Sequence, residues 1–400
     1  MNNTISVGVD IGSQTIKVIV SESSSDKEKT KPRIVGVGYA ESKGLRHGYI
    51  LNIEELIPEL KKAISLAEKS SGIKITKAHL GVSGIGVAGT IFSATQILPD
   101  RENEITREVI EKITAMCERD IPEQYMLNRE VLHAVPLQYK IDNKVVLGKP
   151  IGMKGTKLEV KMLFITCIAR HLEDLIEALN ECGVSIQDVA SGALAGSLSC
   201  LTKAQQVAGC VLLNIGAETV SATVFENGTP ISLEIFQIGG NDITNDIALG
   251  LKIPLEDAER VKLARPETVS YPRKKLEEII SARLGDIFEL VEAHLKKIGR
   301  SGLLPAGVIM TGSSASIPHI EELAKTYLKL PAKKACMKFD GETKCVIKDG
   351  SFSIAYGLTI LGINSNRSSR RPKIFAGEIN VKKIKGKFMD LLGVFKRFLP

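Results

Sequence analysis

The pattern of apolar and polar positions predicts two similar hairpins in this chain. Residues 6–20 and 209–225 each read as an apolar strand that ends in an acid or an amide, followed by Ile-Gly, a short polar turn and a second strand rich in β-branched residues. Runs of this kind joined by a glycine-containing turn are typical of antiparallel hairpins. Just beyond the second one, Asn227 and Gly228 predict a tight type I′ turn into a further strand.

Other apolar patterns predict a strand-turn-helix unit and two helices. Residues 306–321 read as a buried strand, a turn at Gly312 and a helix with Pro318 in its first turn. Residues 254–263 and 271–298 carry apolar side chains at helical spacing, which predicts one short and one long helix.

The C-terminal residues predict an amphipathic helix on a flexible linker. Within residues 387–399 Lys396 lies at the edge of an apolar helical face and Arg397 lies opposite it. The apolar face consists of Phe388, Leu391, Leu392, Phe395, Phe398 and Leu399. Residues 364–372 before it are polar and charged, as in a tether. We expect this helix to bind anionic membrane lipid reversibly; docking of the helix on the body of the protein is the alternative.

The positive charge of the chain is concentrated in this tail. Residues 365–400 hold ten Lys and Arg against Glu378 and Asp390, a charge of +8, whereas the whole chain carries +7, so the other residues sum to −1. A basic tail could also bind nucleic acid. The apolar face of the helix, the absence of Trp and an aromatic content of only 4% argue against that partner, and we expect no nucleic-acid binding.

Composition indicates an ordinary globular protein of two or more domains. The chain has 400 residues, of which 44% are hydrophobic. Its first residues lack the basic and apolar regions of a secretory signal, and no run approaches the roughly 18 apolar residues of a spanning helix. We therefore expect a protein that is neither secreted nor membrane-spanning. Seven cysteines without a C-x-x-C pair indicate neither a zinc site nor a disulfide framework.

The turn of the first hairpin has the composition of an anion-binding site. Gly12 allows close approach of the backbone to an anion, and consecutive N–H groups there can form a concavity. Asp10 at the end of the strand can order the water around Mg²⁺. One such hairpin is more often an ordinary turn. Two matched hairpins that face each other would hold the phosphates of a nucleotide from both sides.

These motifs resemble the actin-like ATPase superfamily, in which two phosphate hairpins and an adenosine turn occur in this order. Within it, the chain resembles the FtsA family of bacterial cell-division proteins over nearly its whole length. Segments outside the nucleotide loops add to the resemblance: residues 44–53, 129–136, 150–155, 237–262 and 353–360. The resemblance implies an α/β, actin-like (ribonuclease H-like) two-lobed ATPase fold that binds ATP and Mg²⁺.

The resemblance also implies a domain organisation. The first actin-like half (1A) would comprise residues 1–83 and 167–200, and the second half (2A) residues 201–237 and 304–363. An inserted 1C subdomain would span residues 84–166, with a strand at 87–97 and a helix at 107–118. A second insert (2B) would span residues 238–303. Residues 364–386 would be the linker and 387–399 the membrane-targeting helix.

The resemblance further implies the nucleotide contacts. They are Asp10, Gly12, Ser13, Gln14 and Thr15 in the first loop, Gly216, Ala217, Glu218 and Thr219 in the second, Gly239, Gly240 and Asn241 at the start of 2B, and Gly312, Ser313 and Ser314 beside the adenosine. Lys17 either reaches a phosphate or is solvated. Glu259 and Lys262 either flank the adenosine or form an i,i+3 ion pair on a surface helix.

The second loop departs from the pattern of the family. Where the family usually has an acid followed by glycines, this chain has Asn214, Ala217 and Glu218. A neutral amide orders Mg²⁺-bound water less strongly than a carboxylate, and an inward-pointing Glu218 would add negative charge beside the phosphates. We expect ATP binding with weak or absent ATPase activity. Asp10 would contact Mg²⁺ through water, and no residue is a certain catalytic group.

The function that the resemblance implies is cell division. Such a protein polymerises head to tail at the cytoplasmic face of the cell membrane, at the division site. It binds the C-terminal peptide of FtsZ through 2B and recruits later division proteins through 1C. Lys275 and Arg283 are candidates for contacts with that acidic peptide, although exposed helix charges commonly serve only in solvation.

Two other actin-like interpretations remain. A PilM-like scaffold of type IV pilus assembly shares the fold and the insert, but it lacks the amphipathic tail. A sugar kinase or a heat-shock-type chaperone would carry a substrate cleft or a peptide-binding domain, and neither is visible in the sequence.

Overall fold

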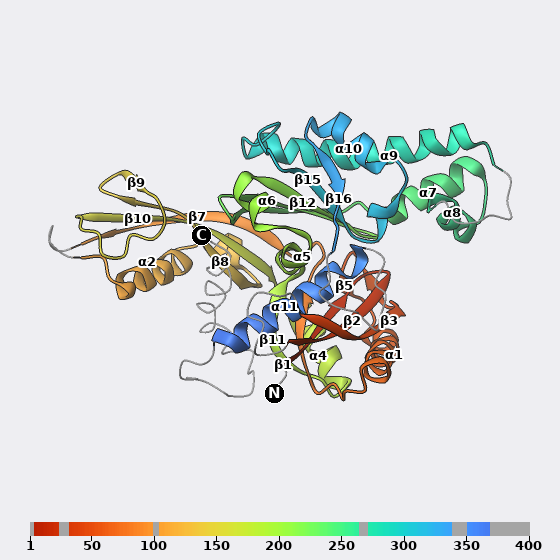
Figure 1. The fold of residues 1–400 in the computed structure, drawn as a ribbon, viewed down its shortest axis with the longest axis horizontal. Coiled ribbons are helices and arrows are strands. Elements are labelled where there is room, and N and C mark those ends of the chain that lie inside the picture. The colour runs from red at the N-terminus through yellow and green to blue at the C-terminus, as the bar shows by residue number, and fades with distance from the viewer. Residues whose placement is uncertain (1–3, 24–31, 99–103, 264–270, 338–349, 369–400) are drawn as a thin grey trace.

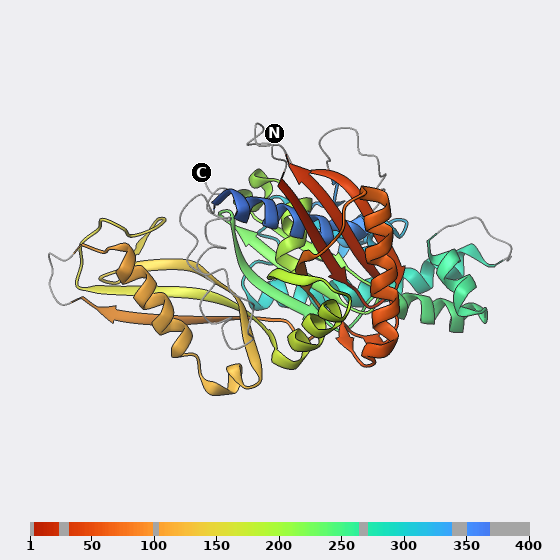
Figure 2. The same ribbon diagram turned by 90° about the horizontal axis from the view of Figure 1, so that it is seen from below.

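The computed structural model describes residues 4–23, 32–98, 104–263, 271–337 and 350–368. Within these ranges the chain forms two halves, each built on a five-stranded sheet, and an inserted domain with a four-stranded sheet (Figure 1). The inserted domain and the pair of helices α7 (Gly240–Leu251) and α8 (Leu255–Lys262) lie at opposite ends of the long axis in both ribbon views (Figure 2). The expected two-lobed, actin-like α/β architecture with an insert is therefore present.

The sheet of the first half has the strand order β11-β6-β1-β2-β3. β1 and β3 pair antiparallel with β2, whereas β6 pairs parallel with β1 and β11. The strands are β1 (Thr4–Ile11), β2 (Thr15–Ser23), β3 (Arg33–Glu41), β6 (Lys77–Val82) and β11 (Ser185–Ser191). A short hairpin, β4 (Leu45–Arg46) and β5 (Tyr49–Ile50), follows β3.

Helices pack on both faces of this sheet because apolar side chains point to both. Val18 and Val20 of β2 belong to the core beneath α1 (Ile53–Ser71) and α4 (Ala169–Glu181). Ile19, on the opposite face, packs with α5 (Gly192–Cys200) and α11 (Ser353–Ser368). Successive strand residues face opposite sides of a sheet, so a continuous apolar run serves two helix layers.

The last helix returns to the first half. Ala355 and Leu358 of α11 lie against Gly8 of β1, where a Cβ would come within 2.1 Å of the Ala355 carbonyl oxygen. The prediction that residues 304–363 belong wholly to the second half was therefore wrong for α11. The helix also continues to Ser368, beyond the expected start of the linker at residue 364.

The inserted domain is an antiparallel sheet of order β7-β10-β8-β9 covered by helix α2. Its elements are β7 (Ala88–Ile97), α2 (Arg107–Arg119), α3 (Glu123–Met126), β8 (Arg129–Ile141), β9 (Lys144–Val146) and β10 (Lys157–Ile168). The strand and the helix predicted at 87–97 and 107–118 are confirmed. This domain also touches the second half, because Gly89 of β7 lies directly against the backbone of Leu233.

The sheet of the second half has the order β14-β13-β12-β15-β16, with β12 and β13 antiparallel and β12 and β15 parallel. The strands are β12 (Cys210–Ile215), β13 (Val220–Glu226), β14 (Thr229–Phe236), β15 (Gly307–Thr311) and β16 (Ala332–Lys334). The helices are α6 (Lys203–Ala208), α7 (Gly240–Leu251), α8 (Leu255–Lys262), α9 (Arg273–Lys297) and α10 (Ile320–Leu328), with 3-10 turns at Ser313–Ser316 and Gly350–Phe352.

Local signals in the second half are confirmed with one correction. α8 and α9 occupy the two predicted helical segments. Asn227 and Gly228 both have positive φ, 52° and 76°, as a type I′ turn requires. After Gly312, however, a 3-10 turn intervenes and α10 begins only at Ile320, so Pro318 precedes this helix and does not lie in its first turn.

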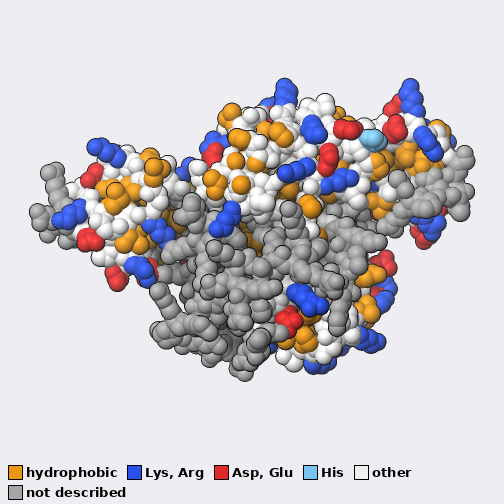
Figure 3. All heavy atoms as spheres, in the orientation of Figure 1, with side chains coloured by type: hydrophobic (Ala, Val, Ile, Leu, Met, Phe, Trp, Pro, Cys, Tyr) orange, Lys and Arg blue, Asp and Glu red, His pale blue; other side chains and the backbone are white. Residues whose placement is uncertain are grey.

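Charged side chains are dispersed over the described part of one face of the molecule. On the face shown in Figure 3, Lys and Arg side chains are interspersed with acidic and apolar ones. This distribution agrees with the near-neutral sum of residues 1–364.

Candidate nucleotide site

The two predicted phosphate hairpins have the same local geometry. β1 and β2 end on the pair Ile11 and Ile16, and β12 and β13 end on the pair Ile215 and Val220. In the first loop (residues 12–15) the Gly12 N–H donates to the Thr15 carbonyl at 3.2 Å. In the second loop (residues 216–219) the Gly216 N–H donates to the Thr219 carbonyl at 2.9 Å. The two turns are therefore equivalent, as their sequences predict.

Asp10 and Asn214 occupy equivalent places, each two residues before the glycine of its loop. Asp10 is 4% exposed and pairs across the hairpin with Lys17. Burial raises the pKa of Asp10 above its ordinary value, and the nearby Lys17 ammonium partly opposes this shift. The carboxylate therefore lies where additional positive charge, such as that of a hydrated cation, would stabilise its ionised form.

Lys17 is not a solvated strand residue. Its side chain is buried at the base of the first loop, and its Nζ donates to the Thr15 carbonyl at 3.5 Å. A Cβ built on Gly12 would lie 4.0 Å from this Nζ. The ammonium therefore lies beside the loop that we expect to face phosphate.

The start of α7 is bound to the second loop. The Gly240 N–H donates to the Gly216 carbonyl at 2.9 Å, and the Asn241 N–H donates to the Ala217 carbonyl at 2.7 Å. At Gly239 a Cβ would come within 2.5 Å of the Ala217 carbonyl oxygen, so only glycine fits there without a shift. These three predicted residues contact the second loop with their backbones.

Glu259 and Lys262 form the i,i+3 ion pair, with Lys262 buried and Glu259 partly exposed. Lys262 is 3% exposed, and its Nζ lies 2.6 Å from the Glu259 carboxylate. The same ammonium donates to the Thr244 hydroxyl at 2.9 Å and to the Gly240 carbonyl at 3.1 Å. Burial lowers the pKa of Lys262, and Glu259 partly offsets this effect. The pair thus joins α8 to the start of α7, next to the second loop.

The predicted adenosine turn also meets the second hairpin. Gly312 has a φ of 97°, and a Cβ there would come within 2.4 Å of the Ile215 carbonyl oxygen and 2.5 Å of the Asn214 Oδ1. The Ser314 hydroxyl donates to the Gly216 carbonyl at 3.3 Å. Two segments far apart in the sequence, residues 239–241 and 312–314, therefore converge on residues 214–217, as the nucleotide hypothesis requires.

Sequence reasoning gave no role to the loop that joins the two hairpins. This bridging loop (residues 44–50) contains the β4–β5 hairpin, and its tip contacts both phosphate loops. The Gly48 N–H donates to the Ser13 hydroxyl at 3.0 Å, and the His47 N–H donates to the Glu218 carboxylate at 2.5 Å. Glu218 is thus directed at the first half. Gly44, at the start of this loop, and Gly48, at its tip, were the sequence signals that could have identified it.

A small polar cavity separates the two halves at this point. It is lined by Ser83 and Ser191 from the first half and by Asn214, Thr219 and Ser221 from the second, and its volume is about 20 Å³. The hydroxyls of Ser83 and Ser191 are buried and have no hydrogen-bond partner among the described residues. The space suits an ordered water, whereas ligand pockets typically measure about 300–1,000 Å³. This cavity by itself is therefore too small to hold a nucleotide.

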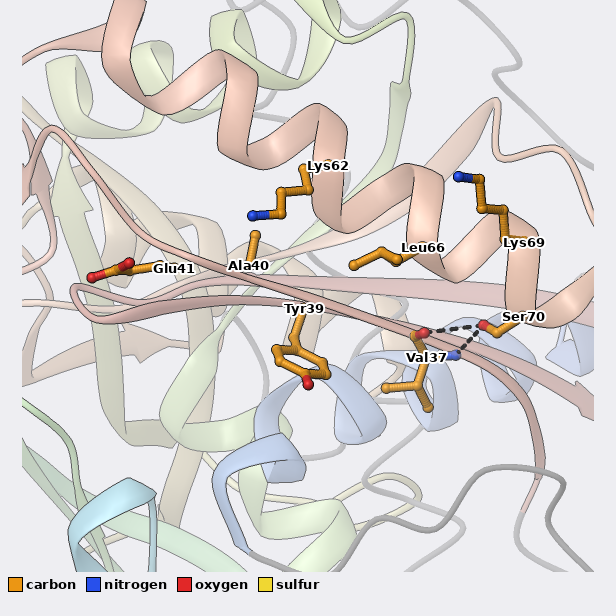
Figure 4. Close-up of a pocket in the computed structure, with 8 residues that line it drawn as sticks. All are labelled: Val37, Tyr39, Ala40, Glu41, Lys62, Leu66, Lys69 and Ser70. Atoms are coloured by element: carbon orange, nitrogen blue, oxygen red, sulfur yellow. Dashed lines mark hydrogen bonds between the residues drawn. The ribbon is translucent and has the colours of Figure 1, made fainter. Parts of the chain in front are cut away.

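The groove in Figure 4 is a separate feature of the first half. It has a volume of about 600 Å³ and runs between β3 and α1, with Tyr39, Lys62, Leu66 and Lys69 among its lining residues. The Ser70 hydroxyl both accepts from the Val37 N–H at 2.9 Å and donates to the Val37 carbonyl at 3.0 Å, which caps this part of the sheet edge. No residue of the predicted nucleotide site lines the groove.

The donor set near the loops fits Mg²⁺ only in a water-mediated form. Within the described part of the chain no three His, Cys, Asp or Glu residues gather as a metal site. Mg²⁺ is commonly held by one or two carboxylates together with water and substrate phosphates. Asp10, with the neutral Asn214 in the equivalent place, fits that second arrangement.

The two proposed peptide contacts differ in their surroundings. Arg283 is engaged within the protein, because its guanidinium forks onto Asp246 at 2.6 and 3.1 Å and also reaches Asp286 at 3.1 Å. Lys275 is exposed near the start of α9. An acidic peptide would have to compete with Asp246 for Arg283, whereas Lys275 is accessible.

The predicted tail residues lie outside the described residues. These are Phe388, Leu391, Leu392, Phe395, Lys396, Arg397, Phe398 and Leu399. Among the helices that the structure does describe, none has both the length and the apolar character needed to cross a membrane.

Comparisons with known proteins agree on one family. The family model of the cell division protein FtsA matches residues 211–357, and that of the SHS2 domain inserted in FtsA matches residues 87–166. Together these matches span more than half of the chain. FtsA of Borreliella burgdorferi is 28% identical, with 97% of this chain and 98% of the relative covered. FtsA of Pseudomonas aeruginosa is 27% identical, with 89% of each chain covered.

Solved structures show the same fold at lower identity. The PilM-PilN type IV pilus biogenesis complex has a TM-score of 0.67 and 17% identity, covering 90% of this chain and 98% of the other. MreB5 of Spiroplasma citri bound to ADP has a TM-score of 0.51 and 14% identity, covering 92% and 99%. These likenesses support the fold alone.

Proposed function

Because this chain belongs to the FtsA family of cell division proteins, we propose that it is a nucleotide-binding switch that polymerises on the cytoplasmic face of the cell membrane at the division site. The observation that carries this proposal is the pair of equivalent hairpins whose loops meet through the bridging loop, with α7 and the Gly312 turn packed against the second one. In this arrangement the loop N–H groups other than those of Gly12 and Gly216, which are bonded within their own loops, would face the phosphates of one nucleotide.

The nucleotide would be ATP with Mg²⁺. Asp10 would hold the hydrated ion, and Lys17 would add positive charge beside the first loop. Bound Mg²⁺ would neutralise phosphate charge, while the chain's own residues orient the phosphates and exclude water. Turnover is slow in this proposal because Asn214, Ser83, Ser191 and Ser221 around the small cavity are all neutral, and none of them can act as a base at neutral pH.

Asn214→Asp should raise the rate of phosphate release from ATP at least severalfold. The substitution keeps the size of the side chain and restores an acceptor-only carboxylate, which orders Mg²⁺-bound water more strongly. Ser83 and Ser191 have hydroxyl groups without partners at this cavity and could donate to the new carboxylate. The measurement is single-turnover phosphate release with saturating Mg²⁺ and ATP.

The matched control is Asn227→Asp, in the β13–β14 turn. It adds the same charge at a turn outside the proposed site. An Asn214→Asp variant that releases phosphate no faster than wild type would show that this amide does not limit turnover.

In division, the proposed role is recruitment. The protein would anchor the FtsZ ring through 2B, with Lys275 available to the acidic FtsZ peptide, and would recruit later division proteins through 1C. The amphipathic tail would tether the polymer to lipid. A single helix of this kind binds reversibly, so several tails presented by one polymer would bind far more firmly.

Removal of the tail should strongly reduce binding to anionic vesicles. The truncated chain should end at Ser368, because α11 runs to that residue and Ile363 within it is buried. We expect the full chain to sediment with phosphatidylglycerol vesicles, more so under conditions that favour polymers, and the truncated chain to stay in the supernatant. Adding duplex DNA tests the alternative partner.

Phe395→Asp in the full chain is the complementary variant. It places a charge on the apolar face while leaving Lys396 and Arg397 in place, and it should also weaken sedimentation. Equal sedimentation of all three proteins would overturn the membrane role of the tail.

A further inference from the structure

The tip of the bridging loop presents two backbone donors at a fixed position. His47 and Gly48 have φ values of 50° and 90°, so they form a tight turn between the paired residues Arg46 and Tyr49. The turn packs on the first half, since a Cβ at Gly48 would lie 2.5 Å from the Gly84 Cα and the Ile85 N–H donates to the His47 carbonyl at 3.2 Å. The direction of the two N–H groups is therefore set by backbone packing.

One of these two N–H groups, that of His47, already donates to an anionic side chain. The Glu218 carboxylate, from the second half, accepts from the His47 N–H at 2.5 Å. The His47 ring adds a second contact, with its Nδ1 3.4 Å from the Glu218 carbonyl oxygen. Backbone N–H groups in a turn with positive φ form concavities that favour anions, and hydrogen bonds to a charged acceptor are the stronger kind.

Ser13 supplies a further donor at the same place. Its Oγ accepts from the Gly48 N–H at 3.0 Å, so the hydroxyl hydrogen is directed elsewhere and can be donated to a ligand. Ser13 belongs to the first phosphate loop and Glu218 to the second. The His47 N–H and the Ser13 O–H therefore lie between the two loops that face the phosphates in the proposed function.

We propose that the His47 N–H and the Ser13 hydroxyl form a phosphoryl-binding site between the two phosphate loops, and that the Glu218 carboxylate fills this site in the conformation described here. The proposal rests on nucleotide binding as the function. A terminal phosphate bound by the Ser13 hydroxyl gains the His47 N–H only when it displaces Glu218, which also separates the second loop from the bridging loop. Glu218 thus lowers the preference of the protein for ATP over ADP and holds the halves together without ATP.

The first test compares ATP and ADP affinities of the full chain and two variants. Glu218→Ala removes the internal anion, and Glu218→Gln keeps its size but removes its charge. We expect the ratio of ATP to ADP affinity to rise by about tenfold in Glu218→Ala, as when a charge-assisted hydrogen bond becomes available to the ligand, and by a smaller factor in Glu218→Gln. The control is Glu277→Gln, which removes an equal charge from an exposed position on α9.

Hydrogen exchange of the bridging loop is the second readout. In Glu218→Ala, ATP and not ADP should protect the amide of His47. If both variants bind nucleotide with the wild-type ratio and the His47 amide shows no ATP-specific protection, the phosphoryl site is wrong while nucleotide binding stands. If none of the proteins binds nucleotide, the proposed function fails, and the phosphoryl site fails with it.

Discussion

Gly357→Ala should lower the free energy of unfolding by about 3 kcal/mol, near the upper end of what overpacking usually costs. Gly357 lies where α11 crosses α5, and a Cβ there would come within 1.8 Å of the Ala195 carbonyl oxygen and 2.4 Å of its carbon. Both contacts are with backbone, which cannot move aside as a side chain can. The two helices would have to separate in a region where Tyr356 and Leu358 are fully buried.

Gly250→Ala is the matched control. Gly250 lies inside α7, and its nearest contact would be the end of the Ile279 side chain at 2.5 Å, which can rotate. Alanine favours a helix by up to about 1 kcal/mol over glycine, so this variant should be neutral or slightly more stable. Urea denaturation followed by circular dichroism measures both variants. Similar stability for the two would mean that α11 does not pack against α5 as described.

Asp10→Asn should weaken ATP binding in the presence of Mg²⁺ by about 10- to 100-fold, the range expected when a hydrogen bond to a buried charged group is lost. Asp10 is the buried carboxylate of the first hairpin, and its counterpart in the second hairpin is the neutral Asn214. The substitution leaves no carboxylate at the equivalent positions of the two hairpins. Isothermal titration with ATP, with excess Mg²⁺ or with EDTA, measures the effect.

The dependence on the metal separates two roles of Asp10. If the carboxylate acts through hydrated Mg²⁺, the loss of affinity should be large with Mg²⁺ and small with EDTA. An equal loss under both conditions would indicate a structural role, for example through Lys17. Asp286→Asn, at an exposed position on α9, is the control for the change in charge.

Together these properties suggest how nucleotide and membrane binding could be linked in the proposed function. The Glu218 contact with the bridging loop joins the halves. The inserted domain contacts the second half through Gly89, and the segment that leads into β7 contacts the bridging loop of the first half through Ile85. Opening of the halves by a terminal phosphate would therefore also act on the inserted domain. In the proposed function one tail binds lipid only reversibly, so the number of chains in a polymer would control membrane attachment.

Much of the local structure could be predicted because its causes are local. The two hairpins follow from β-branched runs around a glycine turn, and the Asn227-Gly228 turn follows from residues that tolerate positive φ. α8 and α9 follow from apolar spacing. The predicted start of the helix after Gly312 was wrong because the Ser and Pro residues there suit both a 3-10 turn and the start of an α-helix.

The surroundings of the candidate residues could not be predicted in the same way. The periodicity of α8 placed Glu259 and Lys262 on one helical face, but the contacts that bury Lys262 come from Thr244 and the Gly240 carbonyl of α7. Arg283 shows the same limitation, since Asp246, its strongest partner, lies on another helix. A charge pattern identifies a helical face, and the neighbouring elements decide whether water or protein covers it.

The sequence by itself determined the two hairpins, the glycine turns, the long helix of the second half and the basic amphipathic character of the tail, because each depends on residues close together in the chain. Only the tertiary structure decided that α11 returns to the first half and that His47 meets Glu218, 171 positions away. Contacts between such distant residues depend on how the two sheets are placed. The periodicity of apolar residues along the sequence does not indicate how the two sheets are placed relative to each other.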